Sequence, residues 1–234
     1  MLVKEFMTPV VITVSEDQSM LEARELMRSN GFVSIPVVDD IRRVRGIITI
    51  DDIGRASPSD ASTLSRYEAN YLLGRLKVKD IMSRTVVTVN ADDTIEYVAY
   101  KLYKHRVNAL PVVDENNKLC GIISQNDLFR AFVEIMSMDR SCTRITFDAT
   151  DKVGVIAEVS NLFKENNINI ISIVSKQNQN GSAEVTIRAD LANHGMGIIE
   201  QIREAGYPVT DIMTFEGVDA VSYTHLTLPT KLEV

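Results

Sequence analysis

Hydrophobic positions in the first part of the chain repeat with a constant offset of 75 residues, without a gap from residue 3 to residue 131. In each copy an alternating segment, 11–14 or 86–89, predicts a short strand. Apolar residues at helical spacing follow, and the predicted buried faces comprise Met20, Ala23 and Met27 in the first copy and Ile95, Val98, Ala99 and Leu102 in the second. Two more strands follow, at 35–38 and 46–50 and at 110–113 and 121–124. Each copy therefore reads as strand, helix, strand, strand, helix.

Local signals mark the ends of these units. Ser19 followed by Glu22 predicts a capping box at the start of the first helix. Small and turn-forming residues at 56–62 give way to apolar residues at helical spacing, which predict a connecting helix at 63–77. We assign the first repeat to 1–55, the linker to 56–77 and the second repeat to 78–137.

A different pattern begins after residue 142. Strands are predicted at 144–147, 168–174, 183–187 and 209–213, with helices at 155–163 and 197–205 and a hairpin turn at 178–181. The order βαββαβ predicts a second domain at 143–216, so the fold class is α/β (α+β), tandem repeats followed by a ferredoxin-like domain. Residues 222–234 continue no pattern, and we interpret them as a non-native tail.

Composition and charge exclude several classes of function. The 234-residue chain is 45% hydrophobic and 24% charged, as in folded soluble domains. Its net charge of -7 opposes nucleic-acid binding, and no apolar run approaches the roughly 20 residues that span a membrane. Cys120 and Cys142 form no disulfide framework, and no secretory signal is recognisable. We expect a cytoplasmic protein that binds neither nucleic acid nor membrane.

Catalytic and metal-binding motifs are missing from the sequence. The histidines His105, His194 and His225 are scattered, and no HExxH, GxSxG or GxxxxGK(S/T) motif occurs. We therefore expect no enzymatic activity, no metal and no required cofactor.

The residues that recur in both copies form a recognisable pattern. Each copy contains VxxxM, TV, PVVD and GII(T/S)xxD in this order, the last two at 36–39 and 46–52 and at 111–114 and 121–127. This pattern resembles the CBS domain, here as a tandem pair. The resemblance implies that the two units pack sheet against sheet. It also implies that the clefts between them bind AMP, ADP, ATP or an S-adenosyl ligand.

The resemblance assigns candidate binding residues in both copies. A carboxylate, Asp52 or Asp127, would accept the two ribose hydroxyls. A hydroxyl with an arginine, Thr49 with Arg55 or Ser124 with Arg130, would bind phosphate at the start of a helix. The adenine would lie across from these groups, so that Val33, Ser34 and Ile35 face Asp127 while Asn108, Ala109 and Leu110 face Asp52. The alternative is that both aspartates merely cap the helices that follow.

The C-terminal third resembles an ACT domain. The resemblance rests on the βαββαβ order, on 151–154 at the first turn and on 167–170 after the first helix. It implies a small effector, such as an amino acid, bound near Asp151, Gly154 and Asn169. The alternative is that neither residue binds an effector. Gly154 would then permit close helix packing, Asn169 would satisfy a sheet edge, and the domain would serve dimerisation.

Together these patterns predict a regulatory protein that senses an adenine nucleotide, forms a homodimer and acts on a separate, unidentified protein. A scaffold that oligomerises without binding a ligand is one alternative. An enzyme is the other.

Overall fold

The computed structural model describes residues 1–57, 74–138, 140–150, 153–178, 181–191, 197–216 and 223–225. The chain forms two compact units, Met1–Ala131 and Phe132–Val234. The predicted connecting helix at 63–77 falls mostly on 58–73, which lie outside the described residues. None of the helices in the described ranges is long and apolar enough to cross a lipid bilayer.

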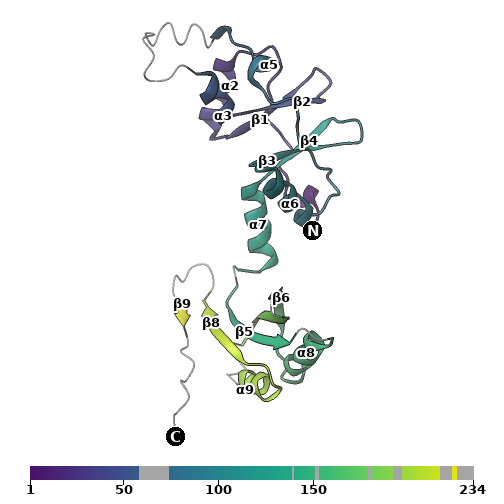
Figure 1. Ribbon diagram of the computed structural model, residues 1–234, viewed down its shortest axis with the longest axis vertical. Helices are drawn as coiled ribbons and strands as arrows, with labels where there is room; N and C mark the ends of the chain where they lie inside the picture. Colours follow the sequence, from purple (N-terminus) through teal and green to yellow (C-terminus); the bar gives the residue numbers. More distant parts are fainter. Residues whose placement is uncertain are drawn as a thin grey trace. The chain divides into compact units, whose positions relative to one another are not determined.

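The first unit holds both sequence repeats, and the repeats share one order of elements (Figure 1). The first repeat contains α1 (Val3–Phe6), α2 (Met20–Asn30), β1 (Ser34–Val38), β2 (Val44–Thr49) and α3 (Ile50–Ala56). The second contains α5 (Val78–Ile81), α6 (Ile95–His105), β3 (Ala109–Val113), β4 (Leu119–Ser124) and α7 (Gln125–Ile135). In each repeat the two strands form an antiparallel hairpin, β1 with β2 and β3 with β4.

The predicted capping box and the helix faces are largely confirmed. The Glu22 backbone N–H donates to Ser19 Oγ at 3.2 Å, and the Ser19 N–H donates to Glu22 Oε2 at 2.9 Å. The predicted core positions of α2 are buried, as are those of α6 except Ala99. Ala99 is exposed because the buried stripe of α6 follows Ile95, Val98 and Leu102, and Ala99 lies to one side of it.

The first strand predicted in each repeat, at 11–14 and 86–89, is not a full strand in the structure. Only one residue of each segment pairs, in a single parallel bridge: Val14 with Val37 and Val89 with Val112. Val14 uses both of its backbone groups there, since its N–H donates to Pro36 O at 3.2 Å and its O accepts from the Val38 N–H at 3.0 Å. The next bond of a parallel ladder would need an N–H from residue 36, which proline lacks. Pro111 blocks the second copy in the same way.

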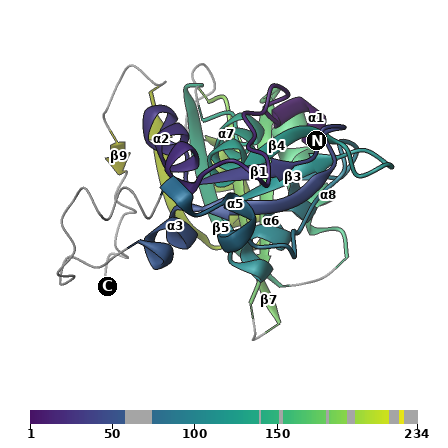
Figure 2. The same cartoon turned by 90° about the horizontal axis from the view of Figure 1, so that it is seen from above.

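The segment that opens each repeat packs against the other repeat. The backbone groups of Thr8 and Ile122 exchange hydrogen bonds of 2.9 and 3.0 Å, and those of Ser83 and Ile47 exchange bonds of 2.9 and 3.0 Å. Figures 1 and 2 both place α5 beside α3 of the first repeat. The core of the first repeat accordingly includes Val78 and Met82, while that of the second includes Val3 and Phe6.

This exchange explains two of the repeated glycines. A Cβ at Gly46 would lie 2.5 Å from Met82 Sδ, and a Cβ at Gly121 would lie 2.5 Å from Met7 Sδ. The methionine of each repeat thus packs against the glycine of the other repeat, Met82 against Gly46 and Met7 against Gly121. The two hairpins then meet through a shared cluster of Val11, Val38, Val44, Val113 and Leu119.

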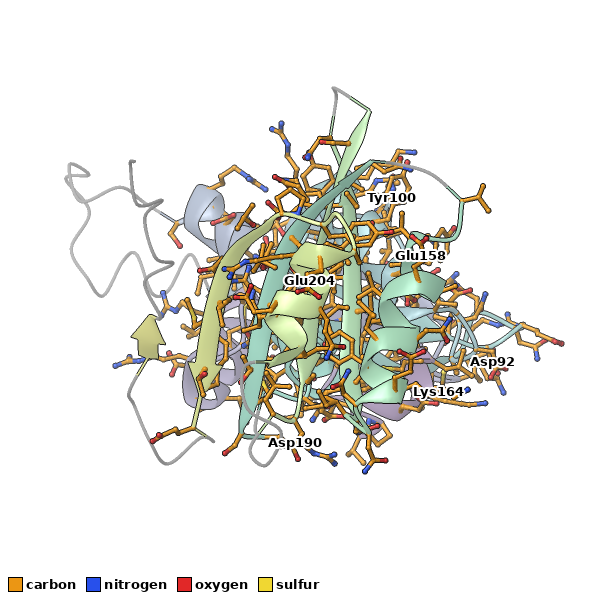
Figure 3. The ribbon with its side chains drawn as sticks, turned by 90° about the horizontal axis from the view of Figure 1, so that it is seen from below. Asp92, Tyr100, Glu158, Lys164, Asp190 and Glu204 are labelled. Carbon is orange, nitrogen blue, oxygen red and sulfur yellow. The ribbon has the colours of Figure 1, made fainter. Side chains whose placement is uncertain are left out.

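The second unit has the predicted βαββαβ order. Its elements are β5 (Cys142–Thr150), α8 (Val155–Glu165), β6 (Ile170–Gln177), β7 (Ser182–Ala189), α9 (Gly197–Glu204) and β8 (Val209–Phe215), followed by β9 (Tyr223–His225). The sheet has the order β6-β7-β5-β8-β9, and every pair is antiparallel. Figure 3 shows α8, which carries Glu158 and Lys164, and α9, which carries Glu204, on one face of this sheet.

The core of the second unit lies between that face and the two helices. Its largest buried side chains include Phe147, Phe163, Ile145, Ile187, Ile198 and Ile202. Strand β9 belongs to the segment that we interpreted as a non-native tail, and it pairs with β8 at Met213, Thr214 and Phe215. The sheet therefore continues by one short strand into a segment whose sequence pattern predicted no element.

Candidate functional site

The motif side chains of the first unit lie where a strand ends and a helix begins. Thr49 ends β2 and caps α3, and Ser124 ends β4 directly before α7. Asp52 and Asp127 follow three residues later, in the first turn of each helix. The first backbone N–H groups of a helix have no intrahelical acceptor, so both places favour an anionic partner.

The two carboxylate oxygens of Asp127 differ: the protein binds Oδ2 through hydrogen bonds but not Oδ1. Its Oδ2 accepts hydrogen bonds from the Ser124 backbone N–H at 2.8 Å and from the Ser124 hydroxyl at 2.7 Å. Its Oδ1 faces Arg130 Nη2 at 3.6 Å, beyond hydrogen-bond distance, and the side chain is 18% exposed. One carboxylate oxygen is fixed by the protein, and the other remains available to a ligand.

A pocket of about 360 Å³ opens beside Asp127. Val33 and Ser34 of the first repeat and Asn108, Ala109 and Ser124 of the second contribute to its wall. The pocket brings Val33 and Ser34 together with Asp127, as the crossed arrangement implied. It also contains Asn108 and Ala109, which the resemblance had set opposite Asp52.

Several predicted positions do not line the pocket: Arg130, the three residues of the other crevice (Thr49, Asp52 and Arg55), and two strand residues. Ile35 and Leu110 are almost fully buried in the cores of their own repeats. Both lie on strands in which the neighbouring residues, Ser34 and Ala109, line the pocket instead. Since successive side chains of a strand point to opposite faces, a three-residue segment cannot present all its side chains to one site.

The sequence reasoning missed part of the wall, namely Thr8, Val10, Ile12, Phe32 and Asn126. Val10, Ile12 and Phe32 are all exposed apolar side chains. The alternation of the segment 11–14 places Ile12 on the same face as the buried Val14, so the sequence pattern provides no signal for its exposure.

Asp52 has a different environment from Asp127. Its Oδ2 accepts from the Thr49 backbone N–H at 2.8 Å and from the Thr49 hydroxyl at 2.7 Å, while Oδ1 accepts from Arg55 Nη2. The carboxylate is 4% exposed. Both oxygens are engaged within the protein, and the Asp52 N–H returns a bond to Thr49 Oγ1 at 3.2 Å. This is the geometry of a helix-capping box.

The two arginines also differ. Arg55 extends into solvent with a side chain 73% exposed and contacts Asp52. Arg130 donates from Nη2 to the backbone oxygen of Phe6 at 2.6 Å, and its guanidinium carbon lies 5.7 Å from the centre of the Phe6 ring. Arg130 therefore contacts the segment that opens the chain and also forms an ion pair with Asp127 Oδ1 at 3.6 Å, a looser contact than that between Arg55 and Asp52.

The candidate effector residues of the second unit are only partly described. Asp151 lies outside the described residues. Gly154 precedes α8 with φ 100°, and an added Cβ would meet nothing within 4 Å. The backbone conformation rather than close helix packing therefore explains this glycine. Asn169 is exposed, and its backbone oxygen accepts from the Asp190 N–H at 3.2 Å, a bond that does not involve its side chain. Within the described ranges, no group of three His, Cys, Asp or Glu side chains could hold a metal ion.

Family models match the chain in three places. A CBS domain model matches residues 3–59 and again residues 78–134, and an ACT domain model matches residues 143–196. The first two matches coincide with the sequence repeats and the third with the βαββαβ unit.

Two curated proteins show how far the likeness extends. A homoserine O-acetyltransferase of Methanosalsum zhilinae is 36% identical over 126 residues, 54% of this chain and 23% of that protein. An L-aspartate semialdehyde sulfurtransferase of Methanocaldococcus jannaschii is 29% identical over 131 residues, 56% of this chain and 23% of that protein. The chain thus spans about a quarter of the length of the curated relatives it matches.

Two solved structures are similar to part of this chain. The CBS domain pair of protein MJ0100, in complex with 5′-methylthioadenosine and S-adenosyl-L-methionine, is 28% identical and aligns over 57% of this chain and 97% of that one, with a TM-score of 0.48. A Vibrio cholerae structure named for the acetoin utilization protein AcuB is 22% identical and aligns over 59% of this chain and 94% of that one, with a TM-score of 0.50.

Proposed function

Because the chain is a pair of CBS domains followed by an ACT domain, we propose that it is a regulatory protein that binds an adenine nucleotide or an S-adenosyl ligand and catalyses no reaction. The pocket at Asp127 is the observation that carries this proposal, because its wall combines the motif carboxylate with segments of both repeats. Its volume of about 360 Å³ falls within the roughly 300–1,000 Å³ common for small-molecule sites.

The groups around the pocket match three parts of such a ligand. Asp127 Oδ1 would accept the ribose hydroxyls through charge-assisted hydrogen bonds, and its exposure supports this role. The first turn of α7 would offer donors to a phosphate or another anionic group, and Arg130, which pairs with Asp127 and does not line the pocket, would add positive charge. Val10, Ile12, Phe32 and Val33 supply an apolar wall against which a purine can pack.

A ligand in this pocket would touch both repeats and so favour one arrangement of the two. It can shift that equilibrium only by as much as its affinity differs between the arrangements. We propose that this shift alters how the protein engages a separate partner. The order of a CBS pair followed by an ACT domain resembles the acetoin utilisation protein AcuB, and we therefore propose a partner in carbon metabolism, a homodimeric state and a cytoplasmic location.

Isothermal titration of the full chain with AMP, ADP, ATP and S-adenosylmethionine tests the proposal. We expect at least one ligand to bind without being converted, as judged by chromatography of the recovered ligand. At about 100 times its Kd, that ligand should raise the free energy of unfolding by about 2.7 kcal/mol. If no ligand gives heat or moves the melting temperature, the sensor proposal is wrong and the ligand-free scaffold takes its place.

A further inference from the structure

An arginine in the second unit is buried without a partner for its charge. Arg188 in β7 is 2% exposed, and its Nε and Nη2 have no hydrogen-bond partner. The buried hydroxyl of Ser172 in β6 also has none, and Ser172 lies directly opposite Arg188 in the β6–β7 ladder. Two buried donors without acceptors, side by side on neighbouring strands, are rare in folded proteins.

These two residues lie on the face of the sheet opposite α8 and α9, which we call the open face because neither helix covers it, although the Arg188 side chain and the Ser172 hydroxyl are buried there. The neighbour Ile187 pairs with Ile145, and both are in the core beneath the helices. Since successive side chains of a strand alternate, Arg188 points to the other face. Figure 3 shows α8 and α9 together on the face opposite the open face.

Arg188 has no ion pair with a carboxylate among the described residues, since none lies within 4.0 Å of its guanidinium. Its cross-strand neighbour in β5 is a second arginine, Arg144, which pairs with Asp211 at 2.6 Å. Like charges directly opposite in a sheet are unfavourable. Cys142 is a side-chain hydrogen-bond partner of Arg188, but burial outweighs this contact and raises the pKa of the thiol, so Cys142 supplies no negative charge to Arg188 at pH 7.

The free groups of Arg188 have the geometry of a binding edge. Its guanidinium carbon lies 4.8 Å from the centre of the Phe215 ring, so the ring contacts the guanidinium. Nε and Nη2 carry the two parallel N–H groups along one side of the guanidinium plane. That side binds a carboxylate or a phosphate through two parallel hydrogen bonds.

We propose that the open face of the ACT sheet holds an oxyanion site, in which Nε and Nη2 of Arg188 bind two oxygens of a small carboxylate or a phosphate group and the Ser172 hydroxyl donates a third hydrogen bond. The bound anion supplies the negative counter-charge for the Arg188 guanidinium, since a buried charge is normally paired. The site is separate from the Asp127 pocket and from Gly154 and Asn169, and it does not depend on nucleotide binding.

Titration calorimetry and thermal unfolding of the full chain test this site, with sodium acetate, pyruvate and phosphate as probes and sodium chloride as the reference at equal ionic strength. At least one probe should raise the melting temperature above the chloride value. Arg188→Met should weaken that binding by at least about tenfold. In chloride alone, Arg188→Met should melt no lower than the unmodified protein, because it removes an unpaired buried charge.

Three further variants separate binding from folding. Ser172→Ala should weaken binding several-fold and leave the melting temperature in chloride unchanged. Arg144→Met is the matched control: it should lower the melting temperature, because it leaves Asp211 unpaired, yet keep the response to the anion. Arg188→Lys retains the charge without the two-pronged edge, so it should bind at least about tenfold more weakly even if Arg188→Met does not fold.

The outcomes decide the proposal and the ligand class. A response to acetate or pyruvate but not to phosphate identifies a carboxylate, and the reverse identifies a phosphate. If Arg188→Met lowers the melting temperature equally in every salt, or Arg188→Lys binds as tightly as the unmodified protein, the site is refuted. Asp127→Ala should leave the anion response intact, so failure of the nucleotide proposal is distinguishable from failure of this one.

Discussion

Asp52 and Asp127 occupy equivalent positions in the two repeats, 75 residues apart, but they are not equally available. Both accept two hydrogen bonds from the residue that caps their helix. Asp52 is also in contact with Arg55 and is 4% exposed, whereas Asp127 stands 3.6 Å from Arg130 and is 18% exposed beside a pocket. Both copies of the motif cap their helix, since the Asp52 and Asp127 N–H groups donate to Thr49 Oγ1 and Ser124 Oγ, but only Asp127 keeps one carboxylate oxygen without a hydrogen bond beside a pocket.

The last residue of the short helix at the start of each repeat explains why the two carboxylates differ in availability. Phe6 and Ile81 are equivalent, and each lies in the short helix that packs against the other repeat. Arg130 contacts both the backbone carbonyl and the ring of Phe6. Ile81 has no ring to offer Arg55, and Arg55 instead donates a hydrogen bond to Asp52 of the same repeat. A duplicated motif therefore does not guarantee two equal sites, because the availability of each carboxylate depends on where its arginine goes.

The largest expected effect is on ligand affinity. Asp127→Ala removes the open ribose acceptor and should weaken nucleotide binding by about 2–4 kcal/mol, roughly 30-fold or more. Asp52→Ala is the matched control. It should lower the free energy of unfolding by about 1 kcal/mol through loss of the cap and leave affinity at the Asp127 pocket unchanged. Titration calorimetry and denaturant unfolding of both variants measure the two quantities.

Equal loss of affinity in the two variants would mean that both crevices bind. Unchanged affinity in Asp127→Ala would mean that this carboxylate is a helix cap as well, and the comparison between the repeats would then lose its functional meaning.

The next effect concerns the two glycines at the exchanged segments. Gly46→Ala and Gly121→Ala should each lower the free energy of unfolding by about 1–3 kcal/mol, because the added methyl overlaps a methionine. Gly46→Ala should be the more costly, since its Cβ would also lie 3.0 Å from the Ser83 backbone oxygen, against 3.3 Å from Thr8 O at Gly121. Denaturant titration measures both losses of stability. If Gly121→Ala were the more costly, the contacts with the methionine side chains, and not those with the backbone oxygens, would determine the loss.

A smaller effect is expected at the ring that holds Arg130. Phe6→Ile gives the second repeat the residue of the first and removes a cation–π contact of about 0.5–1 kcal/mol. Arg130 should then move toward Asp127, and nucleotide affinity should fall by roughly two- to five-fold. Ile81→Phe at the equivalent position should leave affinity unchanged. If Phe6→Ile also binds as before, the Phe6 carbonyl alone positions Arg130.

Much of the fold could be predicted because it depends on local patterns. The buried faces of α2 and α6, the capping box at Ser19 and the βαββαβ order follow from spacing along the chain. The exchange of opening segments could not be predicted from spacing, since Met7 and Gly121 are far apart in sequence and only their contact explains either.

The sites were less predictable because they depend on side-chain partners. The pairing of Val33 and Ser34 with Asp127 followed from the resemblance, but nothing in the repeated motif distinguishes Asp127 from Asp52. Arg188 alternates with Thr186 and Glu184 on a strand, a pattern that predicts a polar, solvated face. The structure buries it instead, and a buried charge without a partner is visible only once the surroundings are known.

The smallest effect tests how the two long helices of the repeats end. Gly31 follows α2 with φ 68°, and its counterpart Arg106 follows α6 with φ 54°, both in the left-handed region where glycine has no Cβ penalty. Arg106→Gly should therefore raise the free energy of unfolding by roughly 0.5 kcal/mol, because the relief of strain is partly offset by the greater freedom of glycine in the unfolded chain. Gly31→Ala should lower it by about 1 kcal/mol, since alanine must then adopt a positive φ. Urea titration of the pair measures both changes. If Arg106→Gly lowers stability, the Arg106 side chain makes a favourable contact that outweighs the strain, and the second repeat is stabilised at this end by a contact that the first does not use.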